Sequence, residues 1–125
     1  MIVFSSKIYW INFQNERASL EQASLTGSNR RTILSDHLFR PRSLIIKDKF
    51  IYWMDGLSRN RRGRGFKLER FNIESNMRET VCHSEDVTIT PFSMDVSDSL
   101  ASVYVTDWSS NAIWRLDLNI TKHER

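Results

Sequence analysis

The chain has 125 residues, of which 40% are hydrophobic and 11% aromatic, so it can form a globular domain and does not have the composition of a disordered chain. The net charge of +3 is too modest for a dedicated nucleic-acid-binding protein, whose basic surface is normally broader. Cys82 is the only cysteine, which excludes an internal disulfide, and no apolar run approaches the roughly 18 residues of a membrane-spanning helix.

The first six residues, Met1 to Ser6, are too few and become polar too quickly for a secretory signal peptide. We therefore keep two alternatives: the chain has no export signal, or it is a piece of a longer protein.

In chain order, the first unit contains predicted strands at residues 2–4, 7–11, 20–25 and 30–34. Ser5 and Ser6 form a predicted turn, and residues 12–17 are polar and read as a loop. Residues 26–29 (Thr-Gly-Ser-Asn) predict a tight turn, because Gly supplies a positive φ and Asn tolerates one. A connection at residues 35–40 then leads to Pro41.

The second and third units repeat this order. Strands are predicted at 41–46, 50–54, 68–73 and 78–82 in the second unit, and at 91–96, 103–107 and 113–118 in the third. A polar loop rich in Gly and Arg is predicted at residues 56–65. The sequence stops before a convincing fourth strand of the third unit.

The second predicted strand of every unit has the same character. Residues 7–12, 50–55 and 102–107 are short apolar runs in which aromatic or β-branched side chains alternate before a polar turn. Their tyrosines, Tyr9, Tyr52 and Tyr104, stand 43 and 52 residues apart, which is the spacing of β-propeller blades. A β-sandwich would also have short, regularly spaced strands, but we would not expect it to repeat one aromatic pattern at every fourth strand.

The fold class predicted is therefore all-β: a partial β-propeller of about three four-stranded antiparallel blades, the last of them incomplete. The whole chain, 1–125, forms this one partial propeller. The predicted boundaries are a blade at 1–38, a blade at 39–86 and an incomplete blade at 87–125.

Several motifs then carry a family resemblance. Residues 52–55 and 104–107 are variants of the tetrapeptide Tyr-Trp-Thr-Asp, and the strands at 68–73 and 113–118 share the pattern apolar-x-Arg-apolar. The other two motifs are the Gly-Ser-Asn-Arg turn at 27–30 and the Pro-x-Ser-apolar segments at 41–44 and 91–94. In phase over nearly the whole chain, these resemble the class B (YWTD) repeats of the low-density lipoprotein receptor family. Within that family, the wide loop and residues 106–115 are similar to the insect cueball-type receptors.

The sequence departs from the family pattern in two motif positions. Asn12 stands where the motif has Asp, and Val105 stands where it has Trp. Propellers of the family close with six blades, whereas about three are expected here. A bare blade face marks an interaction site or an aggregation risk. The resemblance therefore implies a fragment of a longer receptor-like ectodomain, with cysteine-rich EGF-like neighbours and a membrane anchor elsewhere.

The motif side chains have a structural and a functional interpretation. In the structural one, Tyr and Trp fill the space between blades, while Asp55 and Asp107 accept backbone hydrogen bonds from the following turn. The alternative is an aromatic box that binds a ligand. We favour the structural role because the residues recur in every unit. The set comprises Tyr9, Trp10, Asn12, Tyr52, Trp53, Asp55, Tyr104, Thr106 and Asp107.

Two further features are candidate contact or modification sites. The arginines of the wide loop are Arg59, Arg61, Arg62 and Arg64. They read as a solvated surface loop, as a contact for a glycosaminoglycan or acidic protein, or as a processing-protease site; nucleic acid is disfavoured because few aromatic residues lie among them. Asn119 begins an Asn-Ile-Thr sequon and is a candidate glycosylation site if the protein is exported.

No catalytic or metal-binding pattern is predicted. His37, His83 and His123 are scattered, and the adjacent Cys82 and His83 would point to opposite faces of a strand. Acid sensing by a histidine is a minor alternative. We expect no cofactor, and the predicted function is a non-catalytic extracellular module that binds protein ligands or domains of its own parent chain. The alternatives are a fragment of a propeller-fold hydrolase and a half-propeller that assembles with itself.

Overall fold

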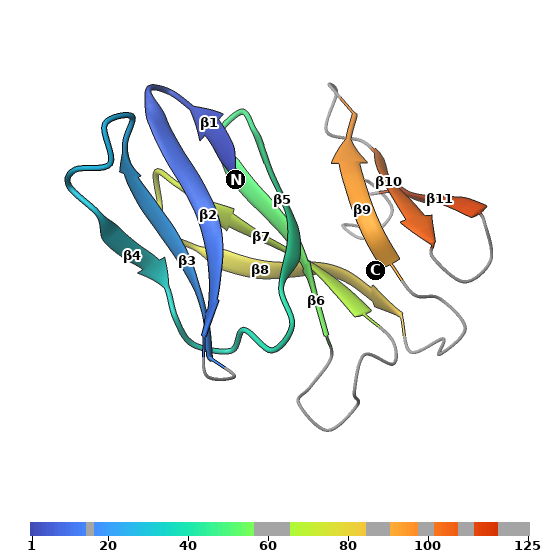
Figure 1. Cartoon of the computed structure of the whole chain (residues 1–125). Coiled ribbons are helices and arrows are strands. Elements are labelled where there is room, and N and C mark those ends of the chain that lie inside the picture. The colour runs from blue at the N-terminus through green and yellow to red at the C-terminus, as the bar shows by residue number, and fades with distance from the viewer. Residues whose placement is uncertain (15–16, 57–65, 85–90, 98–101, 108–111, 118–125) are drawn as a thin grey trace.

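The fold is all-β in the computed structural model, which describes residues 1–14, 17–56, 66–84, 91–97, 102–107 and 112–117. Three antiparallel sheets follow one another along the chain (Figure 1). Within the described residues, no helix is long and apolar enough to cross a membrane.

The first sheet has four strands in sequence order. They are β1 (Ile2–Phe4), β2 (Lys7–Gln14), β3 (Arg17–Ser24) and β4 (Arg31–Leu34). The hairpin of β2 and β3 keeps one register from Lys7 opposite Ser24 to Gln14 opposite Arg17. A bulge between Leu20 and Glu21 shifts the pairing of β3 with β4.

The second sheet repeats this order with longer outer strands. Its members are β5 (Arg42–Lys47), β6 (Phe50–Asp55), β7 (Phe66–Asn72) and β8 (Arg78–Ser84). The bulge recurs at the equivalent place, between Leu68 and Glu69. The two sheets are therefore copies of one unit that share the bulge between their third and fourth strands, although β5 and β6 have a further register shift that β1 and β2 lack.

The third sheet has three strands among the described residues. They are β9 (Pro91–Val96), β10 (Ser102–Asp107) and β11 (Ala112–Asp117), with β10 in the centre. Tyr104 pairs with Arg115, just as Tyr52 of the second sheet pairs with Arg70.

The hairpin turns follow from residue types that accept a positive φ. Gly27 (φ 89°) and Asn29 (φ 56°) shape the turn between β3 and β4, and Asn76 (φ 60°) holds the equivalent turn between β7 and β8. Asp48 (φ 57°) makes the β5–β6 turn. The tight turn predicted at residues 26–29 is confirmed.

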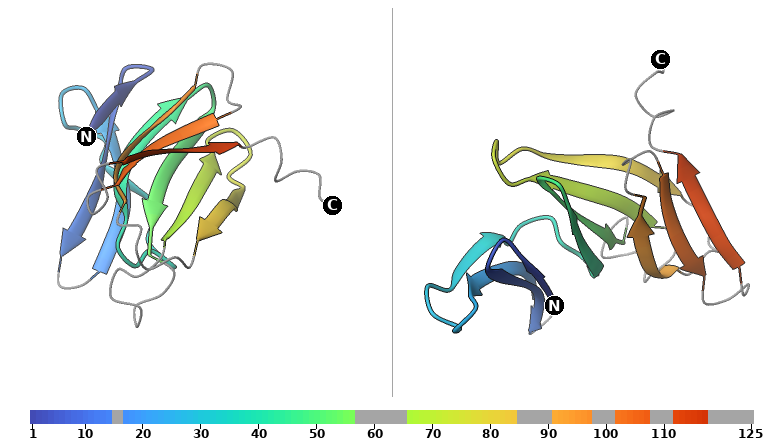
Figure 2. Two further views of the ribbon diagram at one scale, coloured as in Figure 1. Left: turned by 90° about the vertical axis from the view of Figure 1, so that its right-hand side faces the viewer. Right: turned by 90° about the horizontal axis from the view of Figure 1, so that it is seen from above.

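The sheets are arranged as successive blades. Their first strands lie side by side, β1 next to β5 and β5 next to β9, and the outer strands spread away from them (Figure 2). The partial β-propeller predicted from the repeats is therefore confirmed.

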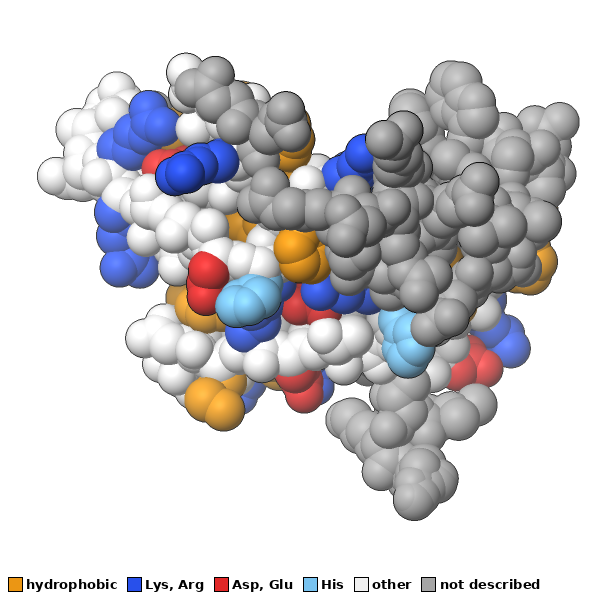
Figure 3. Space-filling model, turned by 90° about the horizontal axis from the view of Figure 1, so that it is seen from below, with side chains coloured by type: hydrophobic (Ala, Val, Ile, Leu, Met, Phe, Trp, Pro, Cys, Tyr) orange, Lys and Arg blue, Asp and Glu red, His pale blue; other side chains and the backbone are white. Residues whose placement is uncertain are grey.

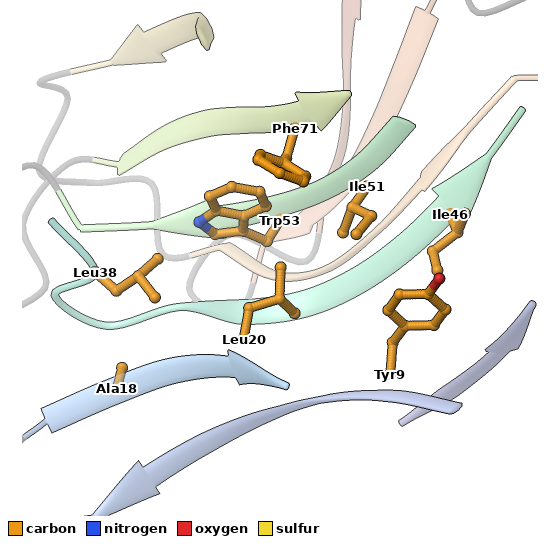
Figure 4. Close-up of a cluster of buried hydrophobic side chains, with 8 residues drawn as sticks. All are labelled: Tyr9, Ala18, Leu20, Leu38, Ile46, Ile51, Trp53 and Phe71. Carbon is orange, nitrogen blue, oxygen red and sulfur yellow. The ribbon is translucent and has the colours of Figure 1, made fainter. Parts of the chain in front are cut away.

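Apolar side chains fill both spaces between neighbouring sheets. The cluster between the first and second sheets contains Tyr9, Ala18, Leu20, Leu38, Ile46, Ile51, Trp53 and Phe71, which face one another across the gap (Figure 4). The cluster between the second and third sheets contains Tyr52, Met54, Leu68, Met94, Val96, Val103 and Val105. The core thus lies between the sheets, as stacked repeat units require.

One local prediction was wrong. Residues 12–17 were expected to form a polar loop, yet β2 continues to Gln14 and β3 begins at Arg17. The hairpin extends because Ala18, opposite Phe13, is buried, and the polar side chains of Asn12 and Gln14 do not prevent backbone pairing.

Candidate functional site

Tyrosine and the residue after it point to opposite sides of each motif strand, as successive residues of a strand do. In the second sheet, Tyr52 joins the cluster shared with the third sheet, while Trp53 joins the cluster shared with the first sheet. Tyr9 points toward Ile46 of the second sheet, in the same cluster as Trp53 (Figure 4). Where two sheets adjoin, the motif tyrosine of the earlier sheet thus packs toward the later sheet, and the residue after the tyrosine of the later sheet packs toward the earlier one.

The third sheet follows the same orientation with a smaller residue. Val105 takes the place of the motif tryptophan, is fully buried and packs into the cluster that contains Tyr52. Asp107 accepts a hydrogen bond from Trp114 Nε1 at 3.1 Å. The Thr106 hydroxyl bonds the backbone of Ser93 on β9, accepting from its N–H at 3.0 Å.

The two outward faces carry the remaining motif aromatics. Trp10 is half-buried on the free side of the first sheet, and the Arg30 guanidinium lies 5.4 Å from its ring centroid. Tyr104 is 44% exposed on the free side of the third sheet. The same residue types are therefore core in one blade and surface in another.

Asp55 closes the contact between the first and second sheets. Its carboxylate accepts backbone N–H groups from Phe39 at 3.1 Å, Arg40 at 2.6 Å and Gly56 at 2.8 Å. Burial raises the pKa of Asp55, although these hydrogen bonds favour its charged form and act against the rise. Asn12 occupies the equivalent place in β2, opposite Ser19.

A second set of side chains, on β7 and β8, also links the second sheet to the residues that follow the first sheet. Arg78 of β8 donates from Nε to Glu69 Oε1 at 2.9 Å, and its guanidinium lies 5.3 Å from the Trp53 ring centroid. The Thr80 hydroxyl donates to the same carboxylate. Arg78 also donates from Nη1 to the carbonyl of Asp36 at 2.8 Å and from Nη2 to the carbonyl of His37 at 2.7 Å.

These bonds fasten residues 35–40, here called the connecting segment, across the second sheet. Arg78 takes the two carbonyls at its start, and Asp55 takes the two N–H groups at its end. Between them, Leu38 is 5% exposed and packs in the cluster around Trp53 (Figure 4). The second sheet thus holds a bent segment, with His37 at a φ of 55°, through its backbone and one apolar side chain.

The first sheet carries the same four side chains. Glu21 accepts hydrogen bonds from Ser19 at 2.6 Å, Thr32 at 2.8 Å and Arg30 Nε at 3.3 Å. Burial alone would raise the pKa of Glu21, but these hydrogen bonds and the positive charge of Arg30 outweigh it and lower the pKa. Trp10, Glu21, Arg30 and Thr32 therefore match Trp53, Glu69, Arg78 and Thr80.

This Trp–Glu–Arg–Thr set was not predicted. The sequence did contain its signal, since Glu and Arg are nine residues apart in both units. In the sequence, Arg30 and Arg78 stand at the start of the returning strands, and Arg30 also ends the Gly-Ser-Asn-Arg turn, so neither position by itself indicates a glutamate partner. The register of β3 with β4 and of β7 with β8 is what brings each Arg beside its Glu.

Several predicted candidates lie elsewhere. Arg59, Arg61, Arg62, Arg64, Asn119 and His123 fall outside the described residues. His37 and His83 are exposed, and histidine side chains reach the surface among scattered Lys and Arg (Figure 3). Burial raises the pKa of Cys82 to about 11, and no cluster of three metal-binding side chains occurs in the described ranges.

Comparison with known proteins agrees with this geometry. Residues 6–46 match the family described as "Low-density lipoprotein receptor repeat class B". Over 111 residues the chain is 28% identical to "Protein cueball" of Drosophila persimilis and 27% identical to that of Drosophila sechellia. These matches cover 86% of the chain but 16% of each relative, so the chain spans about a sixth of their length.

Two solved structures share the fold. The crystal structure of a nidogen/laminin complex aligns with a TM-score of 0.68 at 22% identity, covering 93% of this chain and 40% of that one. TolB from Acinetobacter baumannii aligns with a TM-score of 0.71 at 17% identity, covering 94% and 29%.

The three stacked sheets thus have the fold of a β-propeller. Residues 6–46 match the low-density lipoprotein receptor class B repeat, and the family resemblance predicted from the motifs is confirmed. The matched repeat runs from β2 through the connecting segment into β5, so one sequence repeat begins in one sheet and ends in the next.

Proposed function

We propose that the chain is a non-catalytic, receptor-like module of a larger extracellular propeller, which binds protein ligands or neighbouring domains of its parent chain. We assign one blade to residues 1–38, a second to 39–86 and an incomplete third to 87–125. The main support is that four of the repeated aromatic and acidic side chains are buried in contacts between blades. Tyr9, Tyr52, Trp53 and Asp55 are each at most 2% exposed, so ligands must meet the loops and outer faces instead.

The class of repeat and the relatives support protein binding. The chain carries a low-density lipoprotein receptor class B repeat and is similar to Protein cueball. The fold is shared with a chain solved in a nidogen/laminin complex. A protein surface is therefore the ligand class we assign to this module.

The alternative, a fragment of a propeller-fold hydrolase, has less support. The described residues hold no cluster of carboxylates, histidines or cysteines arranged to bind a metal. The buried carboxylate of Asp55 in the second sheet has its oxygens engaged by backbone N–H groups. It is thus committed to holding the connecting segment.

The experiment that separates the two functions measures binding and turnover on one preparation. The purified chain is tested by biolayer interferometry against immobilised laminin and other matrix proteins, and in parallel with ester, phosphoester and peptide substrates. We expect saturable binding to a protein and no turnover. Hydrolysis at a rate proportional to protein concentration would contradict the proposal and favour the alternative.

The arginine loop gives the proposal a second, narrower test. We propose that Arg59, Arg61, Arg62 and Arg64 contact an acidic partner, with glycosaminoglycans as the simplest probe. Replacing all four with Ser should lower the salt concentration at which the chain elutes from heparin, because each contact with an anionic polymer adds to salt-dependent affinity. Equal elution of the two proteins would contradict this contact.

We also propose an extracellular location, either in the ectodomain of a single-pass membrane protein or in a secreted one. The sequon at Asn119 supports it and makes it testable. When the chain is directed into the secretory pathway of animal cells, it should gain a glycan that peptide N-glycosidase removes. Asn119→Gln should lack that mass; an unglycosylated parent would contradict the assignment of Asn119.

A further inference from the structure

Arg78 shows how this molecule holds a main-chain segment through one guanidinium. Its Nε donates to Glu69 Oε1 at 2.9 Å, and its guanidinium carbon lies 5.3 Å from the Trp53 ring centroid. Its two outer nitrogens donate to the successive carbonyls of Asp36 and His37 at 2.8 and 2.7 Å. Because Glu69 already balances the charge, neutral carbonyl oxygens complete the hydrogen bonds of this side chain without a second anion.

Arg70 has the same supports on the other face of the second sheet. Its Nε donates to the carboxylate of Glu79, and its guanidinium carbon lies 4.3 Å from the ring centroid of Phe50. It stands opposite Tyr52 on β6 and opposite Glu79 on β8, so these three side chains form one row across the strands, here called the Arg70 row. The Arg70 side chain is 17% exposed, close to the 19% of Arg78. The two guanidinium groups are therefore fixed in the same way.

What the Arg70 row lacks is an acceptor. In the part of the chain that the structure describes, the two outer nitrogens of Arg70 make no hydrogen bond. The buried hydroxyl of Tyr52 has no partner there either. Burial acts to lower the pKa of Arg70, but the neighbouring Tyr52 and Glu79 outweigh it and raise the pKa, so the hydroxyl lies near the guanidinium without the geometry of a hydrogen bond. Buried polar groups are nearly always paired in proteins, so this row has unused donors.

The equivalent row of the first sheet is closed. Gln22 donates from Nε2 to the Tyr9 hydroxyl at 2.9 Å, and its Oε1 accepts from Arg31 Nε at 2.9 Å. Arg70 takes the place of Gln22 but does not perform this internal role, since it leaves the Tyr52 hydroxyl without a bond. Arg31 is exposed although the four-stranded second sheet follows the first. The outer end of such a row is therefore open to solvent even beside a four-stranded neighbour.

We propose that Arg70 binds two successive main-chain carbonyls of a protein ligand, as Arg78 does within the chain. The partner contributes neutral peptide groups and not an anion, because Glu79 already balances the guanidinium and repels a second carboxylate. Stacking on Phe50 and the bond to Glu79 fix the guanidinium before the ligand arrives, which reduces the entropy lost on binding. The assignment rests on the protein-binding function proposed above and names a group that meets the ligand.

A titration with a neutral peptide unit tests this contact directly. The isotope-labelled 125-residue chain receives N-acetylalanine N′-methylamide, which has two successive carbonyls, while the side-chain N–H signals of its arginines are followed by NMR. The Arg70 signals should shift with a dissociation constant below roughly 0.5 M, whereas those of Arg78 should stay, because its outer nitrogens are occupied. Unmoved Arg70 signals, or equal shifts in both arginines, would overturn the proposal.

Acetate in place of the amide tests the choice of acceptor. At constant ionic strength, the parent should respond more to the amide than to acetate, because Glu79 repels the anion. Glu79→Gln removes that charge, so the order should reverse, and acetate should bind roughly threefold more tightly than it binds the parent. A parent that prefers acetate would reveal an anion site and contradict the assignment of a main-chain partner.

The first sheet supplies the matched control variant. Arg70→Gln combined with Glu79→Arg copies the closed row of the first sheet, so the Tyr52 hydroxyl gains a partner and the free guanidinium fork is lost. We expect the melting temperature to stay the same or to rise by up to roughly 4 °C, because a buried hydroxyl becomes bonded. A fall of similar size would show that Arg70 serves the fold, and the proposal would fail.

Failure of this site is distinguishable from failure of the function on which it rests. If the parent binds laminin in biolayer interferometry, the double variant should bind roughly tenfold more weakly. Equal affinity would place the ligand elsewhere and overturn only the site. If the parent binds no protein, the function fails, while the amide titration still decides whether Arg70 takes carbonyls. Where the double variant does not fold, Arg70→Lys replaces it, since lysine keeps the charge but lacks the fork.

Discussion

The first and second sheets carry the same Trp–Glu–Arg–Thr set at equivalent positions, yet the tryptophan side of the second sheet is interior and that of the first is surface. Trp53 is 2% exposed beneath the connecting segment, whereas Trp10 is half-buried and Arg30 is 58% exposed. In a repeat protein, a side chain becomes core when a neighbouring unit covers it. Comparing the two sheets therefore separates the stability that the Trp–Glu–Arg–Thr side chains contribute by themselves from the stability that a covering unit adds.

The tyrosine side shows the same rule at the other end of the molecule. Tyr9 and Tyr52 are 2% and 0% exposed because a sheet follows each of them, while Tyr104 is 44% exposed. Asp95, which faces Tyr104 from β9, stands where Ile45 faces Tyr52 in the second sheet. The last face is thus more polar than the buried one that it repeats.

The largest expected effect comes from truncating the two tryptophans. Trp53→Ala should lower the free energy of unfolding by about 3 to 5 kcal/mol, because it opens a cavity between two sheets. Trp10→Ala should cost roughly 1 to 2 kcal/mol, since that ring is only half-buried and no second sheet packs against its face in the described residues. Urea unfolding followed by circular dichroism measures both, and equal losses would break the comparison.

The next effect concerns the carboxylate that holds the connecting segment. Asp55→Ala leaves the backbone N–H groups of Phe39, Arg40 and Gly56 without their acceptor, so we expect a loss of roughly 2 to 4 kcal/mol. Asn12→Ala should cost under roughly 1 kcal/mol. Hydrogen exchange sharpens the test, because protection of the Phe39 and Arg40 amides should disappear in Asp55→Ala and persist in Asn12→Ala.

Lowering the pH should change the contributions of the buried carboxylates Glu21 and Asp55 to folding stability in opposite directions. The lowered pKa of Glu21 means that its stabilising contribution is complete above its ordinary value of 4.5 and is lost as the pH falls through the folded-state pKa. The raised pKa of Asp55 means that stability is lost as the pH rises from its ordinary 3.8 through the folded-state pKa.

These signs are checked with Glu21→Gln and Asp55→Asn. Unfolding free energies measured from pH 7 to pH 3 should fall less steeply below pH 4.5 in Glu21→Gln than in the parent. In Asp55→Asn they should fall more steeply over the range just above pH 3.8. Curves parallel to that of the parent would show that neither carboxylate is linked to folding in the way its contacts imply.

The smallest effect reports whether the third sheet covers the second. Cys82 lies beside the cluster between these sheets, and burial raises its pKa from 9.0 to about 11. At pH 8 its thiolate fraction, and hence its rate of alkylation, should be about a hundredfold lower than that of an ordinary thiol. Val103→Ala loosens the cover and should increase the rate; an unchanged rate would indicate that the third sheet does not shield Cys82.

Much of this fold could be predicted from the sequence because its repeats agree at several levels. The separation of the motif tyrosines predicts the length of the repeat, the Gly and Asn residues predict the turns, and alternation of apolar and polar residues predicts the strands. The end of β2 was missed because Asn12 and Gln14 are polar, and residue type does not reveal backbone pairing across a hairpin.

The blade contacts were only partly predictable. That aromatic side chains fill the space between blades could be proposed, but which neighbour each one faces depends on the side of the strand from which it projects. The connecting segment was assigned no role, because its bonds to Arg78 use backbone carbonyls, and a carbonyl leaves no mark in a sequence. The arginine loop and the sequon stay predictions.

The most direct test of the stacked-blade arrangement is a set of NMR distances between sheets. Nuclear Overhauser effects should connect the Leu38 methyl groups with the Trp53 indole, and the Tyr52 ring with the methyl groups of Val103 and Val105. Effects within each hairpin should also be present. If the hairpin effects are observed and those between sheets are absent, the sheets form without stacking, and the account of the buried motif residues is wrong.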